Sequence, residues 1–219
     1  MRPKIYTSIL ALFCAATTAQ ANLIIDPGFE NNPLYGFFDV LTNLSNTGRW
    51  GAEAATISLA TGGVTPPEGT HMLSMTGSGG TYQTAQVTDA SSYAAGSIVN
   101  LSALFNTTKS VSSAGTGVIV TFLNGNDFNA NQIGVISHSL TLDGDDNTWQ
   151  QNSVSGAIPV GTQWIVSQVT YNGASLGGNP GFVDAADLTI EAVPEPGTVL
   201  FGIACVGVAA LRRRRNSAV

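Results

Sequence analysis

The cysteines and most of the basic residues of this 219-residue chain lie near its two ends, and this distribution constrains the fold of everything between them. Cys14 and Cys205 each sit in an apolar terminal segment, so the middle of the chain must fold without a disulfide. Of the eight Lys and Arg residues, only Arg49 and Lys109 fall in the middle. The chain therefore consists of two terminal segments and a body of about 170 residues, which is long enough for one domain with a sizeable core.

The carboxylates follow the opposite distribution, because they all lie in the body or at its edge. An acidic segment of this kind is repelled by phosphate backbones, so we expect no nucleic-acid partner. Few Lys and Arg residues among many Ser, Thr, Asn and Gly residues are typical of a surface that stays soluble through polarity and negative charge.

Residues 1–21 have the organisation of a secretory signal peptide. Arg2 and Lys4 precede the apolar stretch Ile5–Ala16, and Ala19-Gln20-Ala21 supplies the small residues of a cleavage site. We expect an N-terminal signal helix that signal peptidase removes after Ala21.

The other end reads as a signal that halts export. The uncharged apolar run Thr198–Leu211 is followed by the four arginines Arg212–Arg215. This predicts a single short transmembrane helix with its basic end in the cytoplasm and the body on the outer side.

Residues 193–219 resemble the PEP-CTERM sorting signal of Gram-negative bacteria, in which a Pro-Glu-Pro motif, a short transmembrane helix and a basic tail follow one another. The matching recognition residues are Val193, Pro194, Glu195 and Pro196. The resemblance implies transient anchoring in the inner membrane, recognition by an exosortase, removal of the tail, and release or attachment of the body at the cell surface. An ordinary tail anchor is the alternative, since hydropathy and charge alone would look the same.

The body, residues 22–192, alternates apolar and polar residues in the manner of half-buried strands and shows no convincing helical spacing. Val118–Leu123 is apolar on both faces and so predicts a central strand. Together with turn-forming clusters between strands, this predicts an all-β fold, a two-sheet antiparallel sandwich or jelly roll. Strands are expected at Leu23–Ile25, His71–Met75, Tyr82–Val87, Val99–Phe105, Val118–Leu123, Ile133–Leu142, Trp149–Val154, Ile165–Tyr171 and Phe182–Ile190.

The order of landmarks along the body resembles the galactose-binding-like jelly rolls found in many carbohydrate-binding modules. The landmarks are Asn22–Glu30, Trp50-Gly51, Gly69–Ser74, Thr148–Gln151 with Pro159–Thr162, and Phe182–Asp184.

In that group a structural calcium often joins the first and last strands, and the matching carboxylates are Glu30 and Asp184. Calcium takes six to eight oxygen ligands, so carbonyls near Asp26 and Gly28 or the side chain of Asp187 would complete the shell. Ala185 stands where the group usually has a second aspartate, and solvated carboxylates at a strand end are the alternative.

Aromatic side chains are the expected recognition elements, because sugar rings stack their C–H faces on flat rings. The candidates for ligand binding are Tyr35, Trp50 and Tyr82. Packing in the core or at its rim is the alternative for each, since large aromatic residues dominate the cores of β-sandwiches.

Two patterns that suggest other chemistry lack the required context. Gly173–Gly177 matches the G-x-S-x-G pattern of serine hydrolases, but Gly178–Gly181 follows where a helix would have to begin. Asp143, Asp145 and Asn147 have the spacing that opens an EF-hand loop, but Val154 replaces its final glutamate.

The sequence thus predicts an exported, non-catalytic protein of the cell surface or extracellular matrix that binds polysaccharide or supports adhesion. A purely structural matrix protein is one alternative. A secreted glycan hydrolase is another, although no pair of catalytic carboxylates is evident.

Overall fold

The computed structural model describes residues 20–192, apart from residues 32, 46, 54, 62, 76–80, 108–114, 144–147 and 173–179, and apart from the side chains of residues 81 and 82. Most of the signal peptide, the Pro-Glu-Pro motif and the expected transmembrane helix lie outside these residues, as does Ser175 of the G-x-S-x-G pattern. Within the described range, no helix has the length and apolar character needed to cross a membrane.

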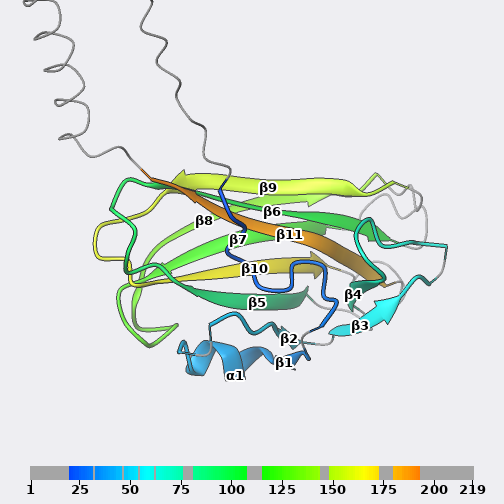
Figure 1. Ribbon diagram of the computed structural model, residues 1–219, viewed down its shortest axis with the longest axis horizontal. Coiled ribbons are helices and arrows are strands. Elements are labelled where there is room, and N and C mark those ends of the chain that lie inside the picture. Colours follow the sequence, from blue (N-terminus) through cyan, green and yellow to red (C-terminus); the bar gives the residue numbers. More distant parts are fainter. Residues whose placement is uncertain are drawn as a thin grey trace, which may run out of the picture.

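The body is a sandwich of two β-sheets, as predicted, and its strands are antiparallel except for the short pair β1–β2 (Figure 1). The six-stranded sheet, called sheet A, has the order β1 (Tyr35–Gly36), β2 (Gly51–Glu53), β5 (Thr81–Asp89), β10 (Trp164–Asn172), β7 (Gly115–Leu123) and β8 (Gln132–Thr141). The five-stranded sheet, called sheet B, has the order β3 (Ala55–Leu59), β4 (His71–Met75), β11 (Gly181–Glu191), β6 (Ile98–Thr107) and β9 (Gln150–Ala157).

Eight of the nine predicted strands correspond to β4 through β11, and β7 lies inside sheet A, paired with β10 on one side and with β8 on the other. The prediction of a strand at Leu23–Ile25 is wrong. Asp26 has a φ of 57° and Phe29 a φ of 56°, so the chain turns sharply just beyond this segment. Leu23 still contacts the last strand, because its N–H donates to the carbonyl of Leu188 at 2.8 Å.

A six-residue helix, α1 (Phe37–Thr42), is the main element that the sequence did not predict. It packs against the outer face of sheet A through its own buried residues Phe37, Val40 and Leu41, which contact Ala85 and Val87 of β5. Its apolar face spans fewer than two turns, too few for a helical period to stand out in the sequence. The helix gives sheet A a second apolar layer outside the sandwich core.

The core between the sheets is built from alternate residues of the long strands. Val99, Leu101, Ala103 and Phe105 of β6 are all buried, as their spacing predicts. The indole of Trp50 is also buried in this core, where it packs against Phe29 with ring centroids 5.0 Å apart and planes tilted by 39°. All described strands and core clusters fall within residues 22–192, so this part of the chain has a hydrophobic core of its own.

Replacing Trp50 by alanine should destabilise the body by about 3–5 kcal/mol, because the change empties a large, fully buried site. The control is Val160→Ala, since Val160 is 86% exposed, and its effect should stay within about 0.5 kcal/mol. Urea unfolding of both variants measures the difference. Equal stabilities would contradict the placement of Trp50 in the core.

Candidate functional site

A cavity of about 430 Å³ opens on the outer face of sheet A, between α1 and the loop that joins β7 to β8. Strands β5 and β10 contribute Gln83 and Gln168 from its sheet side. The lining combines aromatic rings with side chains that form hydrogen bonds: Phe37, Phe38, Leu41, Thr42, Gln83, Asn126, Asp127, Phe128, Asn129 and Gln168.

Phe38 supplies an exposed aromatic ring at this cavity. It is 66% exposed, whereas its neighbour Phe37 is buried under α1. The two rings meet edge to face, with centroids 5.5 Å apart and planes at 85°. Because Phe37 is fixed in a packed layer, it holds the Phe38 ring in a defined position that a sugar ring could stack on.

The opposite wall is a loop whose shape is fixed by hydrogen bonds. One carboxylate oxygen of Asp127 accepts the backbone N–H groups of Asn129 and Ala130 at 2.8 and 2.9 Å. The Asn131 side chain accepts the N–H of Asp127 at 2.9 Å, and the Trp164 indole donates to Asn126 at 3.0 Å. A loop held in this way loses little conformational freedom when a ligand binds.

The polar groups of the cavity are mainly amides. Gln83, Gln168, Asn126 and Asn129 can each donate and accept hydrogen bonds, which suits the hydroxyl groups of sugars. No Lys, Arg or His is among the lining residues, and Asp127 adds a negative charge. The arrangement therefore favours uncharged, hydroxyl-rich ligands over anionic ones.

The three aromatic residues predicted as ligand contacts do not form this site. The prediction that Trp50 contacts a ligand is wrong. Trp50 is 1% exposed, and its indole N–H donates to the carbonyl of Asp26 at 3.0 Å. It therefore belongs to the core and cannot stack on a sugar. Tyr35 is exposed, but the guanidinium of Arg49 lies 4.9 Å from its ring centroid and occupies one face. The side chain of Tyr82 lies outside the described residues.

Sequence reasoning missed the residues that do line the cavity. Phe38 follows another phenylalanine in a short helix, and Gln83 and Gln168 look like ordinary solvent-facing positions of strands. The sequence feature that could have predicted an exposed aromatic ring was the pair Phe37-Phe38, which lies outside any predicted strand. Adjacent residues on a helix point in different directions, so only one of the two rings is expected to face the core.

Glu30, one of the two predicted calcium ligands, is held by the segment that precedes β4. Its carboxylate accepts the backbone N–H groups of Thr70 and His71 at 2.7 and 2.8 Å, and it pairs with the His71 ring at 2.9 Å. The hydrogen bonds from the side chain and then the backbone of His71, with those from Thr70, lower the pKa of Glu30 to about 2. Glu30 is therefore ionised at neutral pH.

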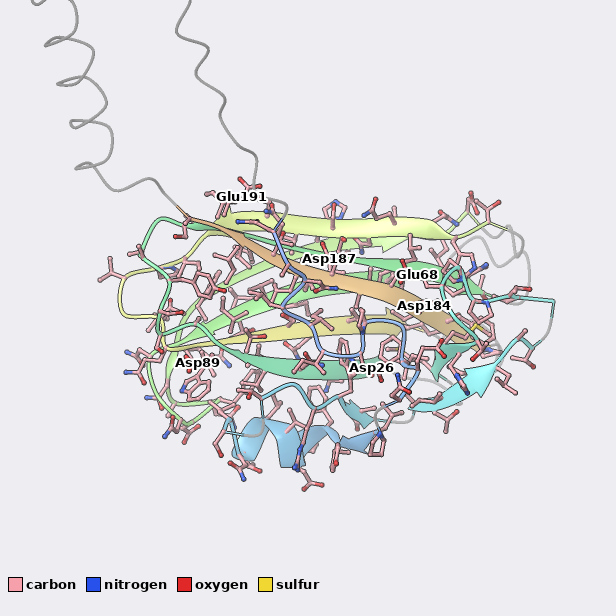
Figure 2. All side chains as sticks on the ribbon, viewed as in Figure 1. Asp26, Glu68, Asp89, Asp184, Asp187 and Glu191 are labelled. Carbon is pink, nitrogen blue, oxygen red and sulfur yellow. The ribbon has the colours of Figure 1, made fainter. Side chains whose placement is uncertain are left out.

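Asp184, the second predicted ligand, is a fully buried carboxyl group beside other acids. Its side chain is 0% exposed and accepts N–H groups of Ala185 at 2.8 Å and of Glu68 at 3.4 Å. Burial raises its pKa to about 7, and the negative charges of Glu68 and Glu30 add to the rise. Figure 2 shows Glu68, from the segment that precedes β4, close to Asp184 of β11, with Asp187 farther along that strand.

Glu30 and Asp184 approach each other across Gly28. A side chain at Gly28 would begin 3.4 Å from a carboxylate oxygen of Asp184 and 3.8 Å from the Cγ atom of Glu30. Asp187 is not among the charges that act on Asp184, and the register of β11 shifts between the two residues. Glu68 is thus a nearer third carboxylate than Asp187, which we had expected from the sequence.

The buried charge of Asp184 fits a cation, because no basic side chain among the described residues pairs with it. Asp184, Glu68 and Glu30 are hard oxygen donors of the kind that calcium prefers. Within the described part of the chain, however, no three acidic, His or Cys side chains already converge on one point. Glu30 would have to exchange His71 for the ion, and backbone carbonyls would have to supply several ligands.

Comparison with solved structures identifies the fold. TmCBM61, whose structure is a complex with β-1,4-galactotriose, has a TM-score of 0.53 and 18% identity, and the match covers 78% of this chain and 99% of that one. The CBM22-1 xylan-binding domain of Paenibacillus barcinonensis Xyn10C has a TM-score of 0.50 and 12% identity, and the match covers 82% of this chain and 100% of that one. The body therefore has the jelly-roll fold of carbohydrate-binding modules.

No family model matches the sequence, and no curated protein matches it.

We propose that a calcium ion bound at Asp184 would stabilise the body. At a concentration one hundred times its Kd, the ion would add about 2.7 kcal/mol, which raises the Tm of a domain of this size by roughly 5–10 °C. Thermal unfolding at pH 7.5, with calcium and then with a chelator, measures the shift. Asp184→Asn should abolish it, and an equal shift in that variant would contradict this site.

The same carboxyl group should make stability depend on pH when calcium is absent. The pKa of Asp184 is about 7 in the folded body and about 3.9 in an unfolded chain, so the folded state holds this proton more tightly. The free energy of unfolding should therefore fall as pH rises from about 4 to about 7. Urea unfolding across this range should show a flatter profile for Asp184→Asn, and identical profiles would contradict the assignment.

Proposed function

We propose that this protein is exported to the cell surface or extracellular matrix and that its body binds neutral polysaccharide, without catalysis, in the cavity between α1 and residues 124–131. The observation that carries the proposal is the exposed ring of Phe38 above a cavity lined with amides. Sugars are recognised by this combination, because their C–H faces stack on aromatic rings while their hydroxyl groups exchange hydrogen bonds.

The charge of the body supports a neutral ligand. Residues 22–192 contain thirteen carboxylates against Arg49 and Lys109. Arg49 lies against Tyr35 and is not among the residues that line the cavity. Uronic acids or sulfated sugars would meet repulsion from Asp127 without a compensating cation.

The cavity chemistry favours binding over hydrolysis. Glycoside hydrolysis ordinarily needs two carboxyl groups on either side of the scissile bond. Asp127 is the one acid among the lining residues, and one of its oxygens is occupied by two backbone N–H groups. A non-catalytic role in sugar binding is supported by the shared fold with TmCBM61, solved with β-1,4-galactotriose, and with the xylan-binding CBM22-1 domain.

Phe38→Ala should weaken binding of a neutral oligosaccharide about five- to twelvefold, because the loss of one stacking ring removes roughly 1–1.5 kcal/mol. A glycan array with residues 22–192 would identify the ligand among β-linked galactans, xylans, glucans and mannans. Titration calorimetry with the variant then measures the loss.

Tyr35→Ala is the matched control, because it removes an exposed aromatic ring outside the cavity and should leave the affinity unchanged. Preferential binding of acidic polysaccharides would overturn the choice of ligand. Absence of any glycan binding by a folded body would favour the purely structural matrix role, and release of reducing sugar would favour a hydrolase.

The proposed route to the surface is secretion through the signal peptide and sorting of the tail by an exosortase. The positions of the two ends of the body support this route. The start of the body, just after the expected signal-peptide cleavage site, lies against the last strand, β11, which leads to the sorting motif. The Asn22 side chain donates to the carbonyl of Ala186 at 2.8 Å and accepts the N–H of Leu188 at 2.9 Å. The last strand ends at Glu191, immediately before the sorting motif, so cleavage there would leave the described sheets intact.

Replacing Pro194, Glu195 and Pro196 together by alanine should block removal of the tail in a host that has an exosortase. Immunoblots of membrane and extracellular fractions should then show a full-length tail-bearing form that accumulates in the inner membrane. Replacing Asn216, Ser217 and Val219 together by alanine is the matched control, because it changes three residues at the other end of the tail. Normal processing of the triple variant would leave an ordinary tail anchor as the better account.

A further inference from the structure

Trp164 connects the apolar layer beneath α1 to the wall of the cavity. It is the first residue of β10, and its ring packs, partly buried, against the cluster that contains Phe37 and Leu41. Its indole N–H donates to the side-chain oxygen of Asn126 at 3.0 Å. Asn126 is exposed and lines the cavity, so an anchored ring holds the side chain of a residue that a ligand can reach.

This hydrogen bond fixes which way the Asn126 amide faces. An indole N–H can only donate, so the amide oxygen of Asn126 must face Trp164, which leaves the NH2 group for another partner. No described residue accepts a hydrogen bond from that NH2 group. Asn126 therefore offers a donor to a ligand, and without the indole its amide could turn over and offer an acceptor instead.

Asp127, the next residue, offers an acceptor. One of its carboxylate oxygens accepts the N–H groups of Asn129 and Ala130, and the other has no hydrogen-bond partner among the described residues. A donor and an acceptor on adjacent residues match a sugar hydroxyl, which can accept from one and donate to the other.

The loop between β7 and β8 does not need the Trp164 bond for its backbone shape. The N–H of Asn124 donates to the carbonyl of Asn131 at 3.0 Å, and the N–H of Asn131 donates to the carbonyl of Asp127 at 2.9 Å. These two bonds close the turn that joins the strands. The bond from Trp164 to Asn126 thus orients one exposed side chain in a turn that is already closed.

We propose, on the basis of the proposed function, that Trp164 is a positioning residue for sugar recognition. It holds the NH2 group of Asn126 toward the ligand, beside the open carboxylate oxygen of Asp127. This pair selects a neutral sugar with free hydroxyl groups, because a hydroxyl accepts from Asn126 and donates to Asp127. A methyl ether at the same position has no hydrogen to donate, so a methylated sugar binds more weakly.

Calorimetric titration of residues 22–192 with β-1,4-galactotriose and with β-1,4-xylotriose tests this role. Trp164→Phe keeps an aromatic ring in the apolar layer but removes the indole N–H, so the affinity should fall about two- to tenfold. Trp149→Phe is the matched control, because it also removes an indole hydrogen bond, to the carbonyl of Thr65 at 2.9 Å, but lies outside the cavity. It should leave the affinity unchanged. Asn126→Ala should weaken binding as well, and adding Trp164→Phe to that variant should cause no further loss.

Circular dichroism checks that each variant is folded. Unchanged affinity in Trp164→Phe, or a loss that persists in the Asn126→Ala background, would overturn the positioning role. Binding that Phe38→Ala still weakened would then leave the proposed function standing. Absence of binding of either trisaccharide to the folded body would overturn the inference, and the glycan array then decides the proposed function separately.

A second measurement needs no substitution at Trp164. In NMR spectra of the unchanged body, a saturating trisaccharide should shift the side-chain NH2 signals of Asn126, because this group donates to the sugar. Binding that leaves those signals in place would overturn the inference.

Discussion

Burial of apolar side chains between two sheets holds this body together, and the rest of the structure depends on it. The body has no cysteine, and the ion pair between Glu30 and His71 is the one salt bridge among its described residues. Apolar area removed from water is therefore the main stabilising term. Long strands such as β6 and β7 meet this demand, because alternate residues of each fill one continuous core.

The same sheets position two chemically different regions. Strands β5 and β10 bury one side of sheet A in the core, while their outer side carries α1 and the amide-lined cavity. The first segment of the body crosses toward β11, where Glu30 and Asp184 lie on either side of Gly28. One region offers stacking and hydrogen bonds to a sugar, and the other concentrates negative charge that a cation would stabilise.

The sequence predicts much of this fold and little of its recognition surface. Strands β6 and β7 could be predicted because burial of one or both faces leaves a visible period. The short elements β1, β2 and β3 could not, since two to five residues carry too little pattern, and Asp26 ended a predicted strand by adopting a positive φ. Trp50 is buried and Phe38 is exposed, and this difference depends on tertiary packing, so the sequence could not show that Trp50 is unavailable for ligand contact. The proximity of Glu30 and Asp184 could be predicted, because the resemblance to galactose-binding-like jelly rolls pairs the carboxylates at these two positions.

The most direct test of the account is where a neutral oligosaccharide contacts the body. NMR spectra of isotope-labelled residues 22–192, titrated with β-1,4-linked galacto- and xylo-oligosaccharides, would report the affected backbone amides. The account predicts shifts that centre on Phe38, Gln83, Gln168 and residues 126–129, with the outer face of sheet B unaffected. Shifts confined to that other face, or to the surroundings of Tyr35, would contradict it.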